Sequence, residues 1–124
     1  MDWKLTDDRP IYLQLVEHIT QLIVSGEYPP ASRLPSVRDL ASDAGVNPNT
    51  MQRALAELER TGLLFSQRTA GRFITEDANL IAAVRETLAV GQINLFFDSM
   101  RAIGYDKQET LHLTERVLNE GAQS

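Results

Sequence analysis

Apolar residues recur every three or four positions after Pro10, which predicts an amphipathic helix in the first part of the chain. Asp7 or Asp8 can cap this helix, Pro10 suits its first turn, and Gly26 followed by two prolines ends it. Trp3 is expected to anchor the arm that precedes it. The stripe must pack against another element and consists of Ile11, Tyr12, Leu15, Val16, Ile19, Leu22 and Ile23.

Two more helices follow in close succession. In "SVRDLASDA", Ser36 stands three residues before Asp39, which is an approximate capping box, and Gly45 ends the helix where a positive φ is expected. Asn47 then caps a third helix that has Pro48 at its first position. Two helices separated by such a short, glycine-bearing turn predict a helix-turn-helix.

The third helix has two chemically different faces. One face is apolar and carries Met51, Ala54, Leu55 and Leu58. The other face is polar over the leading turns and carries Asn49, Thr50, Gln52 and Arg53. A solvated face is the alternative interpretation, but such faces more often carry Glu and Lys pairs. Arg60 lies beside Glu57 and Glu59 and is expected to form a surface ion pair.

A short hairpin is predicted after the helix-turn-helix. Gly62 ends the third helix, and "LLFSQRTAGRFIT" contains two short strands, 63–66 and 72–75, around a polar turn with Gly71. An isolated two-stranded hairpin is marginal in water, so part of it must rest on the helices; the candidates are Leu64, Phe73 and Ile74. A helix-turn-helix followed by a hairpin forms a winged helix.

Two further helices are predicted beyond Asp77, with a possible bend at Gly91 in the first and an Asp106–Glu109 capping box at the start of the second. Two helices in about 45 residues bury little surface alone. Their apolar residues are therefore expected to meet a second copy of the chain, although Phe96 and Phe97 could instead line a ligand pocket. The candidate dimer residues are Leu80, Val84, Leu88, Leu95, Phe96, Met100, Leu111 and Leu118.

The fold class is thus mostly α with a small β-hairpin. Residues 1–75 form a winged helix-turn-helix domain with an N-terminal arm, and residues 76–124 form a helical dimerisation domain.

Charge and composition refine this interpretation. The net charge of −5 belongs mostly to residues 76–124, which hold eight acidic residues against four basic ones. Residues 10–75 are neutral overall, and all six of their bases are arginines between positions 33 and 72. Arginine forks onto phosphates and guanine edges, so a local basic face is compatible with this domain.

Several classes of protein receive no support from the sequence. Apolar runs are short and the N-terminus "MDWKLTDDRP" is acidic, so neither a membrane span nor a signal peptide is expected, and the chain is placed in the cytoplasm. There is no cysteine, and His18 and His112 are the only histidines. No phosphate-binding glycine loop, nucleophile elbow or metal-ligand spacing stands out, so no enzyme, cofactor or metal site is expected.

Residues 10–75 resemble the DNA-binding domain of the GntR family of bacterial transcription regulators. The resemblance rests on "LPSVRDLA", on "GVNPNTMQRALAELERTGLL" and on a wing that ends in "GRFI". The tail, with "FDSMRAIGYDKQETL", is similar to the two-helix dimerisation domain of the YtrA-type subfamily. The resemblance implies a dimeric repressor, often of transporter genes, and two-fold symmetry then predicts an inverted-repeat operator in double-stranded DNA.

The resemblance also implies where DNA is contacted. Arg38 lies on the first helix of the motif, Arg33 in a loop near the phosphates, and the wing departs from the usual basic-residue–glycine tip. The candidate DNA-binding residues are Arg33, Ser36, Arg38, Asn47, Asn49, Thr50, Gln52, Arg53, Arg68, Thr69, Gly71 and Arg72. Arg38 could instead pair with Asp39 or Asp43, and a winged helix could bind protein or RNA. The sequence identifies no effector.

Overall fold

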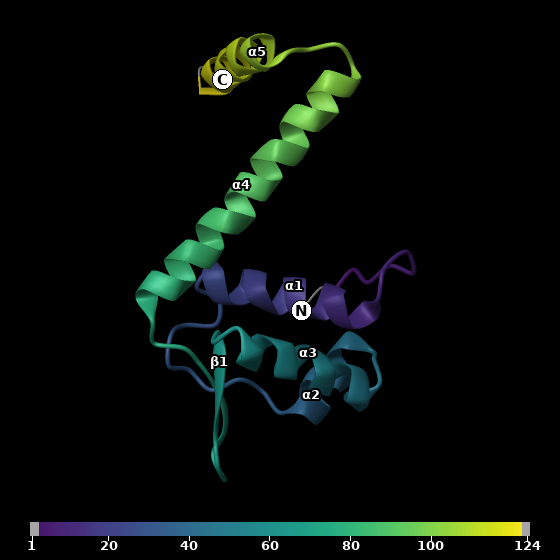
Figure 1. The fold of residues 1–124 in the computed structure, drawn as a ribbon, viewed down its shortest axis with the longest axis vertical. Coiled ribbons are helices and arrows are strands. Elements are labelled where there is room, and N and C mark those ends of the chain that lie inside the picture. Colours follow the sequence, from purple (N-terminus) through teal and green to yellow (C-terminus); the bar gives the residue numbers. More distant parts are fainter. Residues whose placement is uncertain (1–2, 123–124) are drawn as a thin grey trace. The chain divides into compact units, whose positions relative to one another are not determined.

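The computed structural model describes residues 3–122 and divides into two compact units, one ending at Arg85 and one beginning at Glu86. The first unit holds three helices and a hairpin, namely α1 (Ile11–Val24), α2 (Val37–Ala44), α3 (Pro48–Arg60), β1 (Leu64–Gln67) and β2 (Gly71–Ile74). Helix α4 (Ala78–Ala102) begins in the first unit and continues into the second, which also holds α5 (Lys107–Ala122). The mostly helical fold with one hairpin is confirmed (Figure 1).

The start of α1 differs from the prediction. Pro10, not Asp7 or Asp8, occupies the N-cap position, and no side chain caps the helix there. Asp8 accepts a hydrogen bond from the Thr6 hydroxyl instead. Pro10 has ψ of 133°, outside the helical region, so the helix begins at Ile11 and both carboxylates lie too early in the sequence to cap it.

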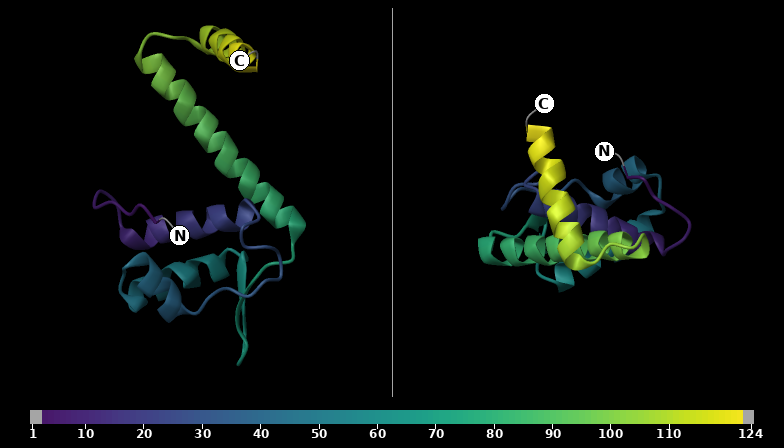
Figure 2. Two further views of the ribbon diagram at one scale, coloured as in Figure 1. Left: turned by 180° about the vertical axis from the view of Figure 1, so that it is seen from behind. Right: turned by 90° about the horizontal axis from the view of Figure 1, so that it is seen from above.

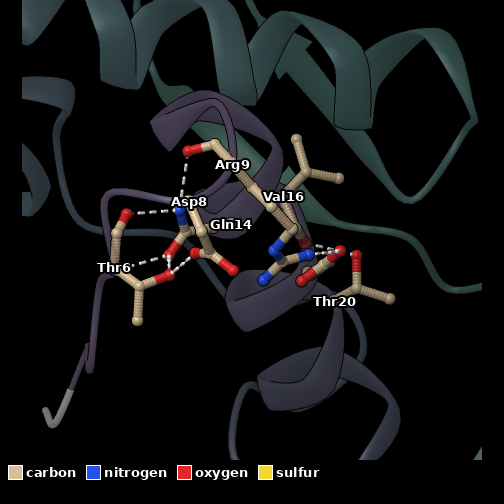
Figure 3. A network of polar contacts seen from close by, with 7 residues as sticks. Thr6, Asp8, Arg9, Gln14, Val16 and Thr20 are labelled. Atoms are coloured by element: carbon tan, nitrogen blue, oxygen red, sulfur yellow. Dashed lines mark hydrogen bonds and ion pairs between the residues drawn. The ribbon is translucent and has the colours of Figure 1, made fainter.

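The N-terminal arm is held to α1 by the buried side chain of Gln14. Its Nε2 donates to the Thr6 carbonyl at 2.8 Å and to the Arg9 carbonyl at 2.9 Å, while its Oε1 accepts from the Thr6 backbone N–H at 2.8 Å (Figure 3). Gln14 therefore satisfies backbone groups of the arm, at Thr6 and Arg9, and ties the arm to α1.

Trp3 anchors the beginning of this arm, as predicted. Its side chain is 7% exposed, its indole Nε1 donates to Asp43 Oδ2 of α2 at 2.9 Å, and its ring centroid lies 4.4 Å from that of His18 on α1. A single aromatic side chain thus joins the arm to two helices.

The helix-turn-helix forms with the capping residues that the sequence indicated. Ser36 caps α2 by accepting a hydrogen bond from the Asp39 N–H at 3.1 Å. Gly45 follows α2 with φ of +71°, in the left-handed region that glycine adopts at little cost. Asn47 caps α3 by accepting from the Asn49 N–H at 2.7 Å, and Pro48 is the first helical residue.

α3 lies at the centre of the first unit. It packs against α1, α2 and β1, and α1 and α3 run side by side (Figure 2). The apolar face of α3 is fully buried, as predicted. The core that surrounds it includes Leu15, Ile19, Ile23, Leu34, Leu40, Met51, Ala54, Leu55, Leu58, Leu64 and Ile74.

The hairpin is shifted by one residue from the prediction. Strands expected at 63–66 and 72–75 are observed at Leu64–Gln67 and Gly71–Ile74, because the turn closes from Gln67 to Ala70 with an N–H to carbonyl bond of 3.1 Å. Residues 32–34 lie along β2, an arrangement that the sequence did not indicate. Leu34 N–H donates to the Arg72 carbonyl at 2.8 Å, and Ile74 N–H donates to the Ser32 carbonyl at 2.9 Å.

α4 is one helix that continues through Gly91, the position of the possible bend, without interruption. Its first turns carry Leu80, Ile81 and Val84, which pack against the core of the first unit. That packing explains why the first unit continues to Arg85, whereas the boundary predicted from sequence follows Thr75.

α5 begins with a complete capping box: the Glu109 N–H donates to Asp106 Oδ1 at 2.8 Å, and the Asp106 N–H donates to Glu109 Oε1 at 3.1 Å. By length and composition alone, α4 could cross a membrane, contrary to the expectation from short apolar runs. A helix that pairs with another protein chain requires similar apolar side chains, so this property does not distinguish the two environments.

Candidate nucleic-acid interface

The leading turns of α3 present polar side chains on the face opposite to the core. Asn49, Gln52 and Arg53 are exposed and Thr50 is partly exposed, whereas the neighbouring Met51 is buried. In a helix-turn-helix this part of the second helix enters the major groove. Amide side chains can form two-point contacts with adenine there, and arginine can do so with guanine.

Asn47 is committed in part to holding α3. Its side-chain oxygen accepts from the Asn49 backbone N–H, which leaves its amide N–H groups and one lone pair of that oxygen available to a ligand. Pro48 has no N–H, and the N–H groups of Asn49 and Thr50 donate to Asn47. The positive end of the helix dipole still favours a phosphate nearby.

Arg38 is exposed on α2. Within residues 3–122 its guanidinium makes no hydrogen bond or ion pair, and the alternative pairing with Asp39 or Asp43 is not observed. Asp43 accepts from Trp3 instead. The charge of Arg38 is therefore available at the surface of α2.

Arg53 is held in place by an aromatic ring. Its guanidinium carbon lies 3.6 Å from the centroid of the Tyr12 ring on α1. A cation over an aromatic face contributes about 0.5–1 kcal/mol at an exposed site. This contact restricts where Arg53 can reach, which the sequence pattern did not reveal.

A cleft of about 370 Å³ lies between the start of α2 and the hairpin. Arg33, Ser36, Thr69, Gly71 and Arg72, all candidate DNA-binding residues, are among those that line it. A Cβ on Gly71 would lie 3.1 Å from Arg33 Nε, and Gly71 has φ of +103°. The positive φ therefore favours glycine at this position, and a Cβ there would also displace the Arg33 side chain by a few tenths of an ångström.

Arg72 is engaged inside the fold. Its Nε lies 2.6 Å from Glu59 Oε1, and its side chain is only 19% exposed. Glu59 also accepts from the Ser66 hydroxyl at 2.5 Å. The Ser66 hydrogen bond and the Arg72 guanidinium lower the pKa of Glu59. The sequence did not indicate that Glu59 pairs with Arg72, because the base nearest to Glu59 along the chain is Arg60.

Arg60 behaves as predicted and pairs with Glu57, at 2.5 Å from Nη2 to Oε1. At the tip of the hairpin, Arg68 is exposed and, in the part of the chain that the structure describes, has no ion-pair partner. The adjacent Thr69 has φ of +80°, which is unfavourable for a β-branched residue. The tip therefore keeps one free cation on a strained turn.

The residues predicted for the dimer interface fall into two groups. Leu80 and Val84 are already partly covered by the core of the first unit. In the second unit Leu95 and Leu118 are 60% and 68% exposed, and Leu88, Phe96 and Leu111 are also exposed. An apolar pocket of about 230 Å³ in this unit is lined by Phe96, Met100, Leu113, Thr114, Val117 and Leu118.

Comparison with known proteins identifies the first unit. Residues 11–74 match the family model described as "Bacterial regulatory proteins, gntR family". The chain belongs to the GntR family. It is 37% identical over 111 residues to the HTH-type transcriptional regulator YhcF of Bacillus subtilis, covering 90% of this chain and 92% of that protein.

The similarity to GntR proteins extends into the tail. The transcriptional repressor YtrA of Bacillus subtilis is 34% identical over 97 residues, which cover 78% of this chain and 70% of YtrA. The chain is a GntR regulator of the YtrA type. The family and these relatives are transcription regulators, so this GntR protein is a regulator and not an enzyme.

Solved structures agree with this assignment. A GntR family regulator from Listeria monocytogenes superimposes with a TM-score of 0.82 at 36% identity, over 90% of this chain and 98% of that one. The AraR DNA-binding domain in complex with operator ORX1 matches with a TM-score of 0.53 at 29% identity, over 60% of this chain and 92% of that one. The winged helix-turn-helix of this GntR protein is thus a DNA-binding domain.

Proposed function

We propose that the protein is a homodimeric repressor that binds an inverted-repeat operator in double-stranded DNA, in the cytoplasm, and controls transporter genes. The observation that carries the proposal is the exposed polar face on the leading turns of α3, accompanied by an exposed Arg38 on α2 that has no ion-pair partner among residues 3–122. A regulator named as a repressor, YtrA, is among its relatives, and the matched AraR domain is bound to an operator.

The proposed readers of the bases are Asn49, Thr50, Gln52 and Arg53, because they lie on the leading turns of α3 and face away from the core. Arg33, Ser36, Arg38 and the amide of Asn47 are proposed to contact the DNA backbone. Such contacts position the domain, whereas contacts to base edges confer specificity. Arg68, Thr69 and Gly71 are proposed to approach the DNA from the wing.

The proposal of a dimer rests on the apolar surface of the second unit. Leu95, Val117 and Leu118 are each more than half exposed. Large contiguous apolar surfaces on a protein in water mark interaction sites. A second copy of the same two helices offers the same surface, and a two-fold dimer interface is self-complementary.

Dimerisation would also compensate for the weak DNA binding expected of a single domain. The protein carries a net charge of −5, so a monomer with few arginines is expected to bind DNA weakly and with strong dependence on salt. Two linked domains bind at high effective concentration. Two-fold symmetry then sets the half-sites about one helical turn apart, or a multiple of it.

Titration with DNA tests the function. We expect the protein to bind a duplex from the region upstream of its own gene at least about 100-fold more tightly than a random duplex at physiological salt, and to bind both more weakly as salt rises. Fluorescence anisotropy at two salt concentrations measures this, and a footprint on the promoter shows the two half-sites. Equal, salt-independent signals for both duplexes, or tighter binding of single-stranded RNA, would refute the repressor proposal.

The double substitution Leu95→Glu and Leu118→Glu is expected to yield a folded monomer. Both side chains are exposed within the chain, so charges there leave the protomer intact but cannot be buried against a second copy. Sedimentation velocity measures the mass, and circular dichroism checks the helices. Gln92→Glu, an exposed polar position on α4, is the control and is expected to stay dimeric. A dimer that survives the double substitution would place the interface elsewhere.

A further inference from the structure

The end of α3 and both strands of the hairpin meet at one carboxylate oxygen. Glu59 Oε1 lies 2.5 Å from the Ser66 hydroxyl of β1 and 2.6 Å from Arg72 Nε of β2. Ser66 and Arg72 are direct partners in the antiparallel register. One side chain of the recognition helix therefore holds the two strands of the wing at the same level.

The environment of Glu59 favours its role as an acceptor. A carboxylate in the last turn of a helix faces the negative end of the dipole, so without donors this position is unfavourable. The Arg72 and Glu59 side chains are 19% and 30% exposed. The neighbouring Arg60–Glu57 pair, at 71% and 35%, is more open to water and salt. The Glu59 cluster is thus the less screened of the two.

The position of the cluster along the hairpin decides what it controls. Leu64 and Ile74 form the first pair of the hairpin and are buried in the core, which fixes its base. Ser66 and Arg72 form the third pair, and only the Gln67–Gly71 pair lies between them and the turn. The Glu59 cluster is the last side-chain tie between α3 and the wing before the tip with Arg68.

The same contact turns Arg72 toward α3. Its Nε is used by Glu59, and four-fifths of its side chain is covered. Arg68 stays exposed at the tip. The wing therefore carries two arginines with different roles, one facing inward toward α3 and one facing solvent.

We propose that Glu59 is a positioning residue for DNA recognition: it fixes the wing against the recognition helix so that Arg68 reaches the DNA, and Arg72 serves this tie instead of contacting DNA. The proposal rests on the operator binding proposed above. Glu59 itself touches no DNA, so its effect must pass through the wing.

A double-mutant cycle on operator affinity tests the proposal. We expect Arg68→Ala and Glu59→Ala each to weaken binding by about tenfold, and the double variant to be no weaker than about the worse single variant, because a misplaced wing already lacks the Arg68 contact. Arg72→Ala is expected to show the same coupling to Arg68→Ala. It replaces Glu59→Ala in the cycle if the Glu59→Ala variant fails to fold. Glu59→Gln keeps an acceptor oxygen and is expected to recover part of the affinity.

Two controls separate positioning from general stability. Gln52→Ala, on the leading face of α3, is expected to combine additively with Glu59→Ala, since the recognition helix itself stays in place. Glu57→Ala lies on the same helix and breaks the ion pair with Arg60, and its effect is expected to combine additively with Arg68→Ala.

Three results would overturn the proposal. The first is additivity between Glu59→Ala and Arg68→Ala, which would make Glu59 a stabilising residue only. The second is unchanged operator affinity in Arg68→Ala. The third is additivity between Arg72→Ala and Glu59→Ala, which would place Arg72 on the DNA. Failure of the operator-binding proposal is distinguishable, because the unmodified protein would then bind no duplex specifically.

Discussion

Arg38→Ala is expected to weaken specific operator binding by at least about 30-fold while leaving the fold intact. Arg38 is exposed and makes no ion pair with any residue in the range 3–122, so its removal exposes no core and breaks no internal contact. A charged hydrogen bond is worth about 1.5–3 kcal/mol. A dimer loses this contact twice, and every 1.4 kcal/mol corresponds to about a tenfold change in affinity.

The matched control is Arg60→Ala. Arg60 is also an exposed arginine, and its removal changes the net charge equally, but its guanidinium pairs with Glu57 at the far end of α3 from the leading turns. We expect only the small loss that any removed positive charge causes. Fluorescence anisotropy with the operator measures both variants, and circular dichroism checks their folding. If Arg38→Ala binds as tightly as the unmodified protein, Arg38 is a solvated surface residue.

Trp3→Ala is expected to lower the free energy of unfolding by about 3–5 kcal/mol. The Trp3 side chain is 7% exposed, and it joins the arm to α1 through His18 and to α2 through Asp43. Its loss leaves a cavity between these elements and an Asp43 carboxylate without its donor. Since the total stability of a domain is about 5–15 kcal/mol, this is a large share.

Urea denaturation followed by circular dichroism measures this loss, because Trp3 is the only tryptophan and its fluorescence disappears with it. Trp3→Phe is the control: it keeps an aromatic ring against His18 and loses the indole N–H, so a smaller loss of about 1–2 kcal/mol is expected. Equal stability of Trp3→Ala and the unmodified protein would show that the arm contributes nothing to the first unit.

The two helices of the DNA-binding motif could be derived from sequence almost completely. Ser36, Gly45, Asn47 and Pro48 each act within a few residues of the chain, so their spacing alone determines where α2 ends and α3 begins. The buried face of α3 follows from the 3.6-residue period of its apolar residues, and the residues between them form the exposed polar face. For the same reason the Asp106–Glu109 capping box of α5 was predicted correctly.

Contacts between distant parts of the chain could not be predicted in this way. Residues 32–34 and β2 are about 40 positions apart, and their pairing depends on how α1 and α3 fold back on each other. Gln14 is a polar residue among the apolar positions of α1, and nothing in the sequence indicates that its side chain holds the arm. Local spacing favours Asp7 and Asp8 as caps of α1, but the helix begins only after Pro10, whose ψ of 133° is not helical.

The wing contains both kinds of feature, those that local sequence predicts and those that depend on distant contacts. Local sequence is enough to predict a short hairpin after α3 with arginines on it, since turn residues and β-branched or aromatic neighbours act locally. The packing of α3 against the hairpin is what turns Arg72 inward to Glu59 while Arg68 stays exposed, because a charge pattern does not show which partner lies across the fold. The free energy of an ion pair depends on distance and burial, and both are set by the packing of α3 against the hairpin.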